Sequence, residues 1–413
     1  MNERPVKELR IFLLLAAWST LVFLGGCGGG KSNSLPPNPI VTSGSNVAPI
    51  EVNTGPPDSG LAYANGAFVS VTVCAPGTST CQTIPYILVD TGSYGLRIVS
   101  SLLTVPLTQE MASDGNAMVE CLQFLDSYTW GPVQAADIEI ASEKASSVAI
   151  QVLSDTDFTV PSSCSSKAAG GSADMVSTLG ANGILGVGQF PQDCGSNTTC
   201  PASADQYYSC ASATAACTPV AATVAQQVPN PVTLFATDNN GVIIELPAVS
   251  SPEATVSGSL VFGIGTESNN SLNGATVYTA DPTNLNFTTA FNGVNYTNEG
   301  FLDSGSNGYF FPDSNIAACP STTGANGFYC PSGTVNLSAT NKGNNGASGT
   351  VNFSVADAEN QFSNDPNDAA YPDLGGPASG YFDWGLPFFY GRNVFTSIEG
   401  KTAPGGTTPY WAY

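Results

Sequence analysis

Short hydrophobic runs bounded by glycine or polar turn residues recur along the chain from about residue 50 onward. In residues 67–73 apolar and polar side chains alternate, which predicts a strand with one buried face. Two other runs, residues 86–90 and 300–303, are continuously apolar until they reach an aspartate. No long heptad run and no short-period repeat interrupts this pattern. The pattern predicts an all-β protein built from many short strands.

The two aspartates stand in matched contexts. Asp-Thr-Gly-Ser occupies residues 90–93 and Asp-Ser-Gly-Ser occupies residues 303–306, each between apolar runs. A carboxylate at the end of a buried strand is costly unless it is hydrogen-bonded or used. One such residue would fit a turn, but two in the same context, more than two hundred residues apart, predict two halves that each contribute a carboxylate to one site.

Composition narrows the chemistry. The 413 residues include 44 glycines and 29 prolines but no histidine, and the net charge is −22. Without histidine, Ser-His-Asp catalysis, Cys-His catalysis and histidine-ligated metal sites are excluded, so we expect carboxylate chemistry with no metal or other cofactor. The strongly acidic surface argues against nucleic acid and anionic lipid as partners.

The N-terminus has the pattern of a signal peptide. Basic residues precede an apolar run at residues 11–24, which ends in Leu-Gly-Gly-Cys at Cys27. We expect residues 1–26 to be removed, Cys27 to be lipidated, and residues 27–47 to form a flexible tether. This predicts a bacterial envelope protein on the outer membrane or cell surface, held to the membrane through Cys27. The alternative is an ordinary signal peptide or an anchor helix.

The remaining ten cysteines form an even set, which predicts disulfides in an exported protein. No CxxC motif occurs, so metal binding by cysteine is the minor interpretation. Neighbours in sequence suggest four local pairs and leave one long-range pair, although sequence alone does not fix the connectivity: Cys74–Cys81, Cys194–Cys200, Cys210–Cys217, Cys319–Cys330, and Cys121–Cys164.

Residues 119–140 predict a hairpin with its tip at residues 125–131. Tyr128 and Trp130 would then lie at the tip, where they would either pack on the surface or act as a lid. Residues 182–188 predict a strand crossing close beneath another backbone. Residues 191–229 predict a stapled loop with a helix near its end, and residues 331–355 a loop-heavy strand region.

The order of these motifs resembles that of the pepsin-like aspartic peptidases. Besides the two Asp-Thr/Ser-Gly-Ser segments, residues 182–186 are similar to that family's Asp-Gly-Ile-Leu-Gly segment, and residues 258–263 to the strand that opens its second lobe. Residues 384–395 look like its closing aromatic stretch. The likeness rests on short motifs spread over most of residues 60–400.

The resemblance implies a two-lobed acid-protease fold, with two closed β-barrel lobes and a cleft between them. The lobes would be residues 48–240, carrying Asp90, and residues 241–413, carrying Asp303. The two aspartates would be catalytic, and six loop residues would support them: Thr91, Gly92, Ser93, Ser304, Gly305 and Ser306.

Three features depart from the family's pattern. Arg97 lies in a strand that should be apolar, the predicted flap hairpin lacks the Tyr-Gly-Thr-Gly run, and residues 384–387 replace the expected Leu-Gly-Asp. These departures affect the flap and the substrate preference more than the pair of aspartates.

The leading hypothesis is therefore a monomeric, envelope-anchored aspartic endopeptidase acting on peptides or proteins. The alternative is a non-catalytic surface lipoprotein that uses the same fold for binding or structure. A glycan-active enzyme with two carboxylates is disfavoured by the paired strand-end motifs. A eukaryotic secreted glycoprotein is disfavoured by the lipidation motif, although Asn-x-Ser/Thr sequons occur at Asn197, Asn286 and Asn336.

Overall fold

The computed structural model describes every residue except 1–38, 154–155, 157, 167–170 and 196–198. The predicted signal peptide, Cys27 and most of the predicted tether lie outside the described residues. Within the described part of the chain, no helix is both long enough and apolar enough to cross a membrane.

The protein is all-β, and six strands close into a barrel. They run in the order β7 (Tyr128–Ile140), β8 (Glu143–Leu153), β4 (Tyr94–Val99), β9 (Gly183–Val187), β3 (Cys81–Asp90) and β2 (Gly66–Cys74). The ring closes because β2 also pairs with β7, with Thr72 opposite Glu139. Alternating valine and isoleucine side chains of these strands fill the interior.

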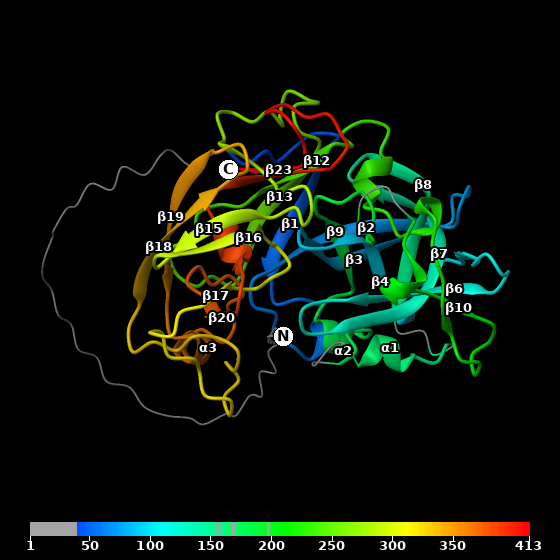
Figure 1. The fold of residues 1–413 in the computed structure, drawn as a ribbon, viewed down its shortest axis with the longest axis horizontal. Helices are drawn as coiled ribbons and strands as arrows, with labels where there is room; N and C mark the ends of the chain where they lie inside the picture. Colours follow the sequence, from blue (N-terminus) through cyan, green and yellow to red (C-terminus); the bar gives the residue numbers. More distant parts are fainter. Residues whose placement is uncertain (1–38, 154–155, 157, 167–170, 196–198) are drawn as a thin grey trace, which may run out of the picture.

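Six further strands extend the barrel's sheet through the middle of the molecule. From the β2 edge they are β1 (Val47–Asn53), β13 (Val256–Phe262), β12 (Gly241–Glu245), β22 (Asn393–Ser397), β23 (Tyr410–Ala412) and β14 (Val277–Thr279). Figure 1 shows several of them between the barrel and a second sheet. Because β1 pairs with both β2 and β13, the first described strand joins early and late parts of the chain.

The second sheet has seven strands and is open. Its order is β19 (Ser348–Val355), β18 (Val335–Lys342), β15 (Phe287–Phe291), β16 (Val294–Leu302), β21 (Phe382–Trp384), β17 (Tyr309–Phe311) and β20 (Gly375–Pro377). The expectation of two closed barrels is therefore wrong for this half. Its edge strands do not pair with each other; near β17, α3 (Ala358–Asn364) packs its Phe362 into a separate apolar cluster with Phe310.

Much of the predicted strand pattern is confirmed. The alternating run at residues 67–73 lies in β2, and the Gly-rich run at residues 182–188 contains β9. Residues 331–355 are more regular than expected, since β18 and β19 form a continuous antiparallel hairpin. The helix expected near the end of residues 191–229 is only a short 3-10 turn, Val224–Gln226.

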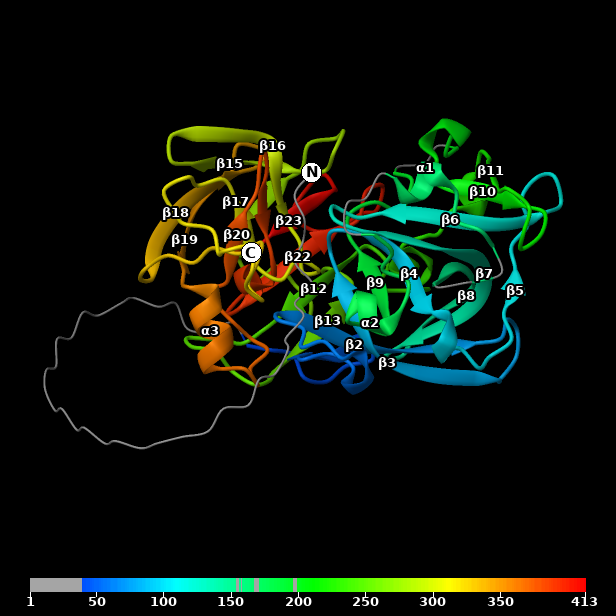
Figure 2. The same cartoon turned by 90° about the horizontal axis from the view of Figure 1, so that it is seen from below.

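Several further strands and two short helices lie around the barrel. They are β5 (Thr108–Gln109), β6 (Ala117–Gln123), β10 (Tyr207–Cys210), β11 (Thr218–Pro219), α1 (Ser162–Ser165) and α2 (Val176–Leu179). Strands β11, β10 and β6 continue the sheet beyond β7. Figure 2 shows β6 running from this side of the barrel toward the seven-stranded sheet.

All five disulfide pairs expected from the sequence are present. Four close short loops, and Cys121–Cys164 joins residues 43 positions apart. Cys74–Cys81 closes the β2–β3 hairpin, where the two residues are directly opposed. The long-range bond ties β6 to α1.

We expect the stabilisation from these disulfides to follow loop length. Replacing Cys121 and Cys164 together by alanine should lower the free energy of unfolding by roughly 4 kcal/mol, because it releases the longest loop. The matched change at Cys74 and Cys81, which are seven positions apart, should lower it by about 2 kcal/mol. Urea denaturation of both variants under oxidising conditions measures the difference; equal losses, or a larger loss at the hairpin, would contradict it.

Candidate active site

Asp90 and Asp303 occupy matching places in the two sheets. Asp90 is the last residue of β3, and Asp303 directly follows β16. β9 pairs in parallel with β3 and antiparallel with β4, and β21 pairs in the same two senses with β16 and β17. The same strand-loop-strand unit therefore delivers each aspartate, as the repeated sequence motif predicts.

The first loop, residues 90–93, and the second loop, residues 303–306, pack closely against each other. A Cβ atom on Gly92 would lie 2.6 Å from the carboxyl carbon of Asp303, and a Cβ atom on Gly305 would lie 2.6 Å from that of Asp90. Each aspartate thus rests on the glycine of the opposite loop, where a larger residue cannot fit. Both carboxyl groups are buried, with Asp90 3% and Asp303 0% exposed.

Donors in each loop hold its own carboxyl group. Gly92 N donates to Asp90 Oδ1 at 2.7 Å, and Ser93 Oγ donates to Asp90 Oδ2 at 2.6 Å. In the other loop, Gly305 N donates to Asp303 Oδ1 at 2.9 Å and Ser306 Oγ lies 2.7 Å from Asp303 Oδ2. These bonds fix both carboxyl planes and offset part of their desolvation.

The hydroxyls of Thr91 and Ser304 make four hydrogen bonds to the backbone of the opposite segment. Thr91 Oγ1 donates to Leu302 O at 2.9 Å and accepts from Ser304 N at 3.0 Å. Ser304 Oγ donates to Val89 O at 2.7 Å and accepts from Thr91 N at 3.1 Å. The bonds are buried and reciprocal, so each hydroxyl satisfies one backbone donor and one acceptor of the facing loop.

Tyr94 follows the first loop and lies near both aspartates. Burial raises the pKa of its phenol well above the ordinary value, and the negative charges of Asp90 and Asp303 raise this pKa further. The ring also packs edge-on against Phe190, with centroids 5.1 Å apart. The phenol therefore stays protonated and available as a hydrogen-bond donor near the carboxyl pair.

Asp383 is a third carboxyl group at this site, and it belongs to none of the motifs that predict the site. It lies in β21 with 1% exposure, and its Oδ2 is 2.7 Å from Ser306 Oγ, the hydroxyl that also contacts Asp303. The available signal was an acidic residue between Phe382 and Trp384 in an apolar strand.

Tyr128 and Trp130 do not lie at a hairpin tip. Both belong to β7, and the turn of the β6–β7 hairpin is at residues 124–127, where Phe124 N donates to Ser127 O. Trp130 is 1% exposed, donates from Nε1 to Phe158 O, and packs against Tyr208. Trp130 is therefore a core residue that fits neither surface packing nor a lid, and Tyr128 is buried in the same apolar cluster.

Arg97, unexpected in an apolar strand, is buried in an ionic cluster. Its Nη2 lies 3.0 Å from Glu120 Oε1 and 3.3 Å from Asp193 Oδ2, with all three side chains almost fully buried. Burial and then the nearby Glu120 raise the pKa of Asp193 well above its usual range. Tyr207 donates to Asp193, so the cluster joins β4, β6 and β10 behind the first loop.

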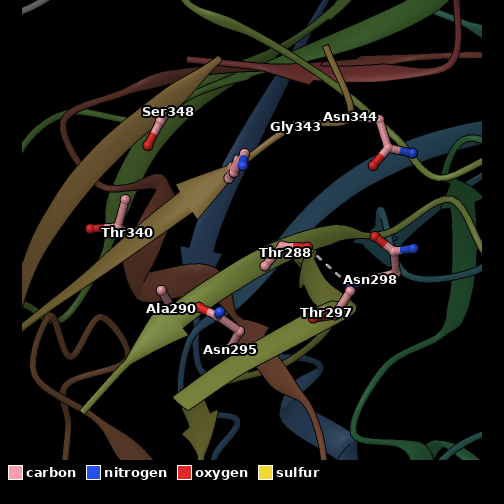
Figure 3. Close-up of a pocket in the computed structure, with 10 residues that line it drawn as sticks. Thr288, Ala290, Asn295, Thr297, Asn298, Thr340, Gly343, Asn344 and Ser348 are labelled. Atoms are coloured by element: carbon pink, nitrogen blue, oxygen red, sulfur yellow. Dashed lines mark hydrogen bonds between the residues drawn. The ribbon is translucent and has the colours of Figure 1, made fainter. Parts of the chain in front are cut away.

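The described part of the protein offers no metal site, and its polar hollow lies away from the two aspartate loops. Within the described residues no group of three or more Cys, Asp or Glu side chains could hold a metal ion. A polar hollow of about 520 Å³ lies over β15, β16 and β18 (Figure 3). Side chains such as Thr288, Asn295 and Thr340 line it, and none of the loop residues around Asp90 and Asp303 does.

Comparison with known proteins gives a family but no activity. A family model described as a protein of unknown function (DUF3443) matches residues 42–413. No curated protein matches the chain.

We expect the four exchanged hydrogen bonds to dominate the stability of the paired loops. Thr91→Val keeps the side-chain shape but leaves the buried Leu302 O and Ser304 N without these partners, and should lower the free energy of unfolding by about 2–4 kcal/mol. The control is Thr83→Val, an exposed position in β3, the strand that ends one residue before Thr91. It removes only an exposed hydroxyl contact with Thr72 and should change the free energy of unfolding by less than about 0.5 kcal/mol. Similar losses for both variants in urea denaturation would refute a special role for the exchange.

Proposed function

The chain belongs to the DUF3443 family of proteins of unknown function, and we propose that it is an aspartic endopeptidase. The observation that carries the proposal is the mutual packing of two buried carboxyl groups, each resting on the glycine of the other's loop. Charged groups this close, and this poorly solvated, are costly to keep for structure alone.

We further propose that the barrel and the seven-stranded sheet act as the two lobes of an acid-protease arrangement. The repeated strand-loop-strand unit supports this idea, since one copy lies in each sheet. The proposed boundary between residues 240 and 241 falls at the start of β12, one of the six strands that extend the barrel's sheet. A substrate peptide would then lie across both Asp90 and Asp303.

The chemistry follows from the proximity of the carboxyl groups. Two such groups cannot both ionise cheaply, so they share one proton. The ionised member accepts a proton from a water molecule, whose oxygen attacks the peptide carbonyl carbon. The protonated member gives its proton to the carbonyl oxygen, forming a neutral gem-diol.

Collapse of the gem-diol completes the reaction. The carbon–nitrogen bond breaks as the first carboxyl group passes its proton to the leaving nitrogen, and the gem-diol returns a proton to the second. The pair ends in its starting protonation state, with one water consumed for each peptide bond. Ser93 and Ser306 hold the carboxyl groups in plane while these protons move.

The proposal predicts that Asp90→Asn and Asp303→Asn each lower peptide hydrolysis by at least about 10³-fold, because either change removes a proton acceptor or donor. Cleavage of a mixed peptide library, followed by mass spectrometry across acid to neutral pH, measures the loss. The control is Asp373→Asn, which alters another Asp–Ser hydrogen bond in the second sheet. Equal cleavage by all four proteins, or cleavage by none, would refute the peptidase proposal.

We also propose that the protein is exported and anchored to the bacterial envelope through Cys27, followed by the Gly- and Ser-rich stretch. Mass spectrometry of the N-terminal peptide from membranes should find a lipid-modified Cys27 as the first residue. Cys27→Ser should release the protein from the membrane fraction. An unmodified Cys27 within a longer mature chain would contradict the anchor.

A further inference from the structure

Asp383 shares a hydroxyl with Asp303. Ser306 Oγ lies 2.7 Å from Oδ2 of each aspartate, and all three residues are at most 1% exposed. In the strand register, Asp383 stands opposite Phe301 on β16 and Phe310 on β17. The third carboxyl group is therefore flanked by aromatic residues on both neighbouring strands.

The shared contact at Ser306 requires a proton on one of the two carboxyl groups. A serine hydroxyl has one hydrogen, so Ser306 can donate to only one of the two carboxyl groups. The other contact has the length of a hydrogen bond, and an ionised carboxylate has no hydrogen to supply. At least one proton must therefore lie on Asp303 or Asp383.

The surroundings decide which group holds it. Asp303 accepts hydrogen bonds from the N–H groups of Gly305 at 2.9 Å and of Ser306 at 3.2 Å, and these groups can only donate, so they fit a carboxyl group that acts as an acceptor. Asp383 lies deep among aromatic residues and beside this charge, which favours its neutral form. We propose that Asp383 is a neutral carboxylic acid that donates to Ser306 Oγ, while Ser306 donates to Asp303.

The barrel side has no residue that corresponds to Asp383 in this series of hydrogen bonds. Asp383 lies two residues before Gly385, next to the Asp303 loop, and Ile184 lies two residues before Gly186, which stands opposite Asp90. Ile184 is a buried apolar residue, so it cannot polarise Ser93 as Asp383 polarises Ser306. The two matched units thus differ at this position, which is Asp383 in one and Ile184 in the other.

The difference assigns the roles of the pair, and this step rests on the proposed function. Asp303 is the ionised member that takes the proton from water, and Asp90 holds the shared proton and gives it to the carbonyl oxygen. Asp383 is a positioning residue that acts through Ser306. Other titratable groups near these hydrogen bonds include Tyr94, which lies beside both aspartates and near Glu399, and Tyr309 on β17, which lies opposite Trp384 and near Arg392 and Asp373.

The first test is the pH dependence of kcat/KM. Asp383→Leu removes the donor that supports ionised Asp303, so the acidic limb should move to higher pH by about one unit. Asp383→Asn keeps a neutral donor, and its acidic limb should stay with that of wild type and of the control Asp373→Asn. An acidic limb that moves to lower pH in Asp383→Asn would overturn the proposal, because it would mean that a negative charge had been removed.

The second test needs no activity. Infrared difference spectra at pH 7 compare wild type with Asp383→Asn, both carrying ¹³C-labelled aspartate. The variant should lose one band of a protonated carboxylic acid; loss of a carboxylate band instead would overturn the proposal. Loss of the acid band in a protein that cleaves no peptide would refute the peptidase function and leave the neutral Asp383 standing. Cleavage without loss of that band would do the reverse.

Discussion

The exchange of hydrogen bonds between Thr91 and Ser304 is the constraint on which the site depends. Two buried carboxyl groups repel each other and lose their hydration, so the loops that carry them tend to separate. Each hydroxyl opposes this separation by binding a donor and an acceptor of the facing backbone. The glycines then let the loops approach until each carboxyl group lies against the opposite chain.

The sequence predicts this arrangement because the Asp-Thr/Ser-Gly-Ser motif occurs twice. Two aspartates in matched strand-end contexts predict a shared site without any knowledge of the strands between them, and the fold places them in matching units. The disulfides could be paired for a similar reason, since four of them close loops of at most 11 residues and leave one pair over. Local chemistry, in both cases, specifies the outcome.

Features that depend on distant partners could not be predicted. Arg97 is an anomaly in the sequence, and only the fold brings Glu120 and Asp193 to it. The predicted tip of the β6–β7 hairpin extends too far along the chain, because Gly131 is as good a turn residue as Asp126 and Ser127. A shift of a few residues is enough to move Tyr128 and Trp130 from the tip into the core. The prediction of a second closed barrel is wrong because the hydrophobic pattern predicts only where the strands are. Whether the two edge strands of a sheet pair with each other depends on long-range pairing.

The account turns on Asp90 and Asp303 acting as one proton-sharing pair. Calorimetric titration with pepstatin, a peptide whose hydroxyl imitates the attacking water, tests this most directly, because such analogues bind through interactions made in the transition state. Wild type should bind the inhibitor at acid pH, and Asp303→Asn should lose at least about tenfold in affinity. Equal affinity for the two proteins would contradict a shared carboxyl pair, and so would the failure of wild type to bind.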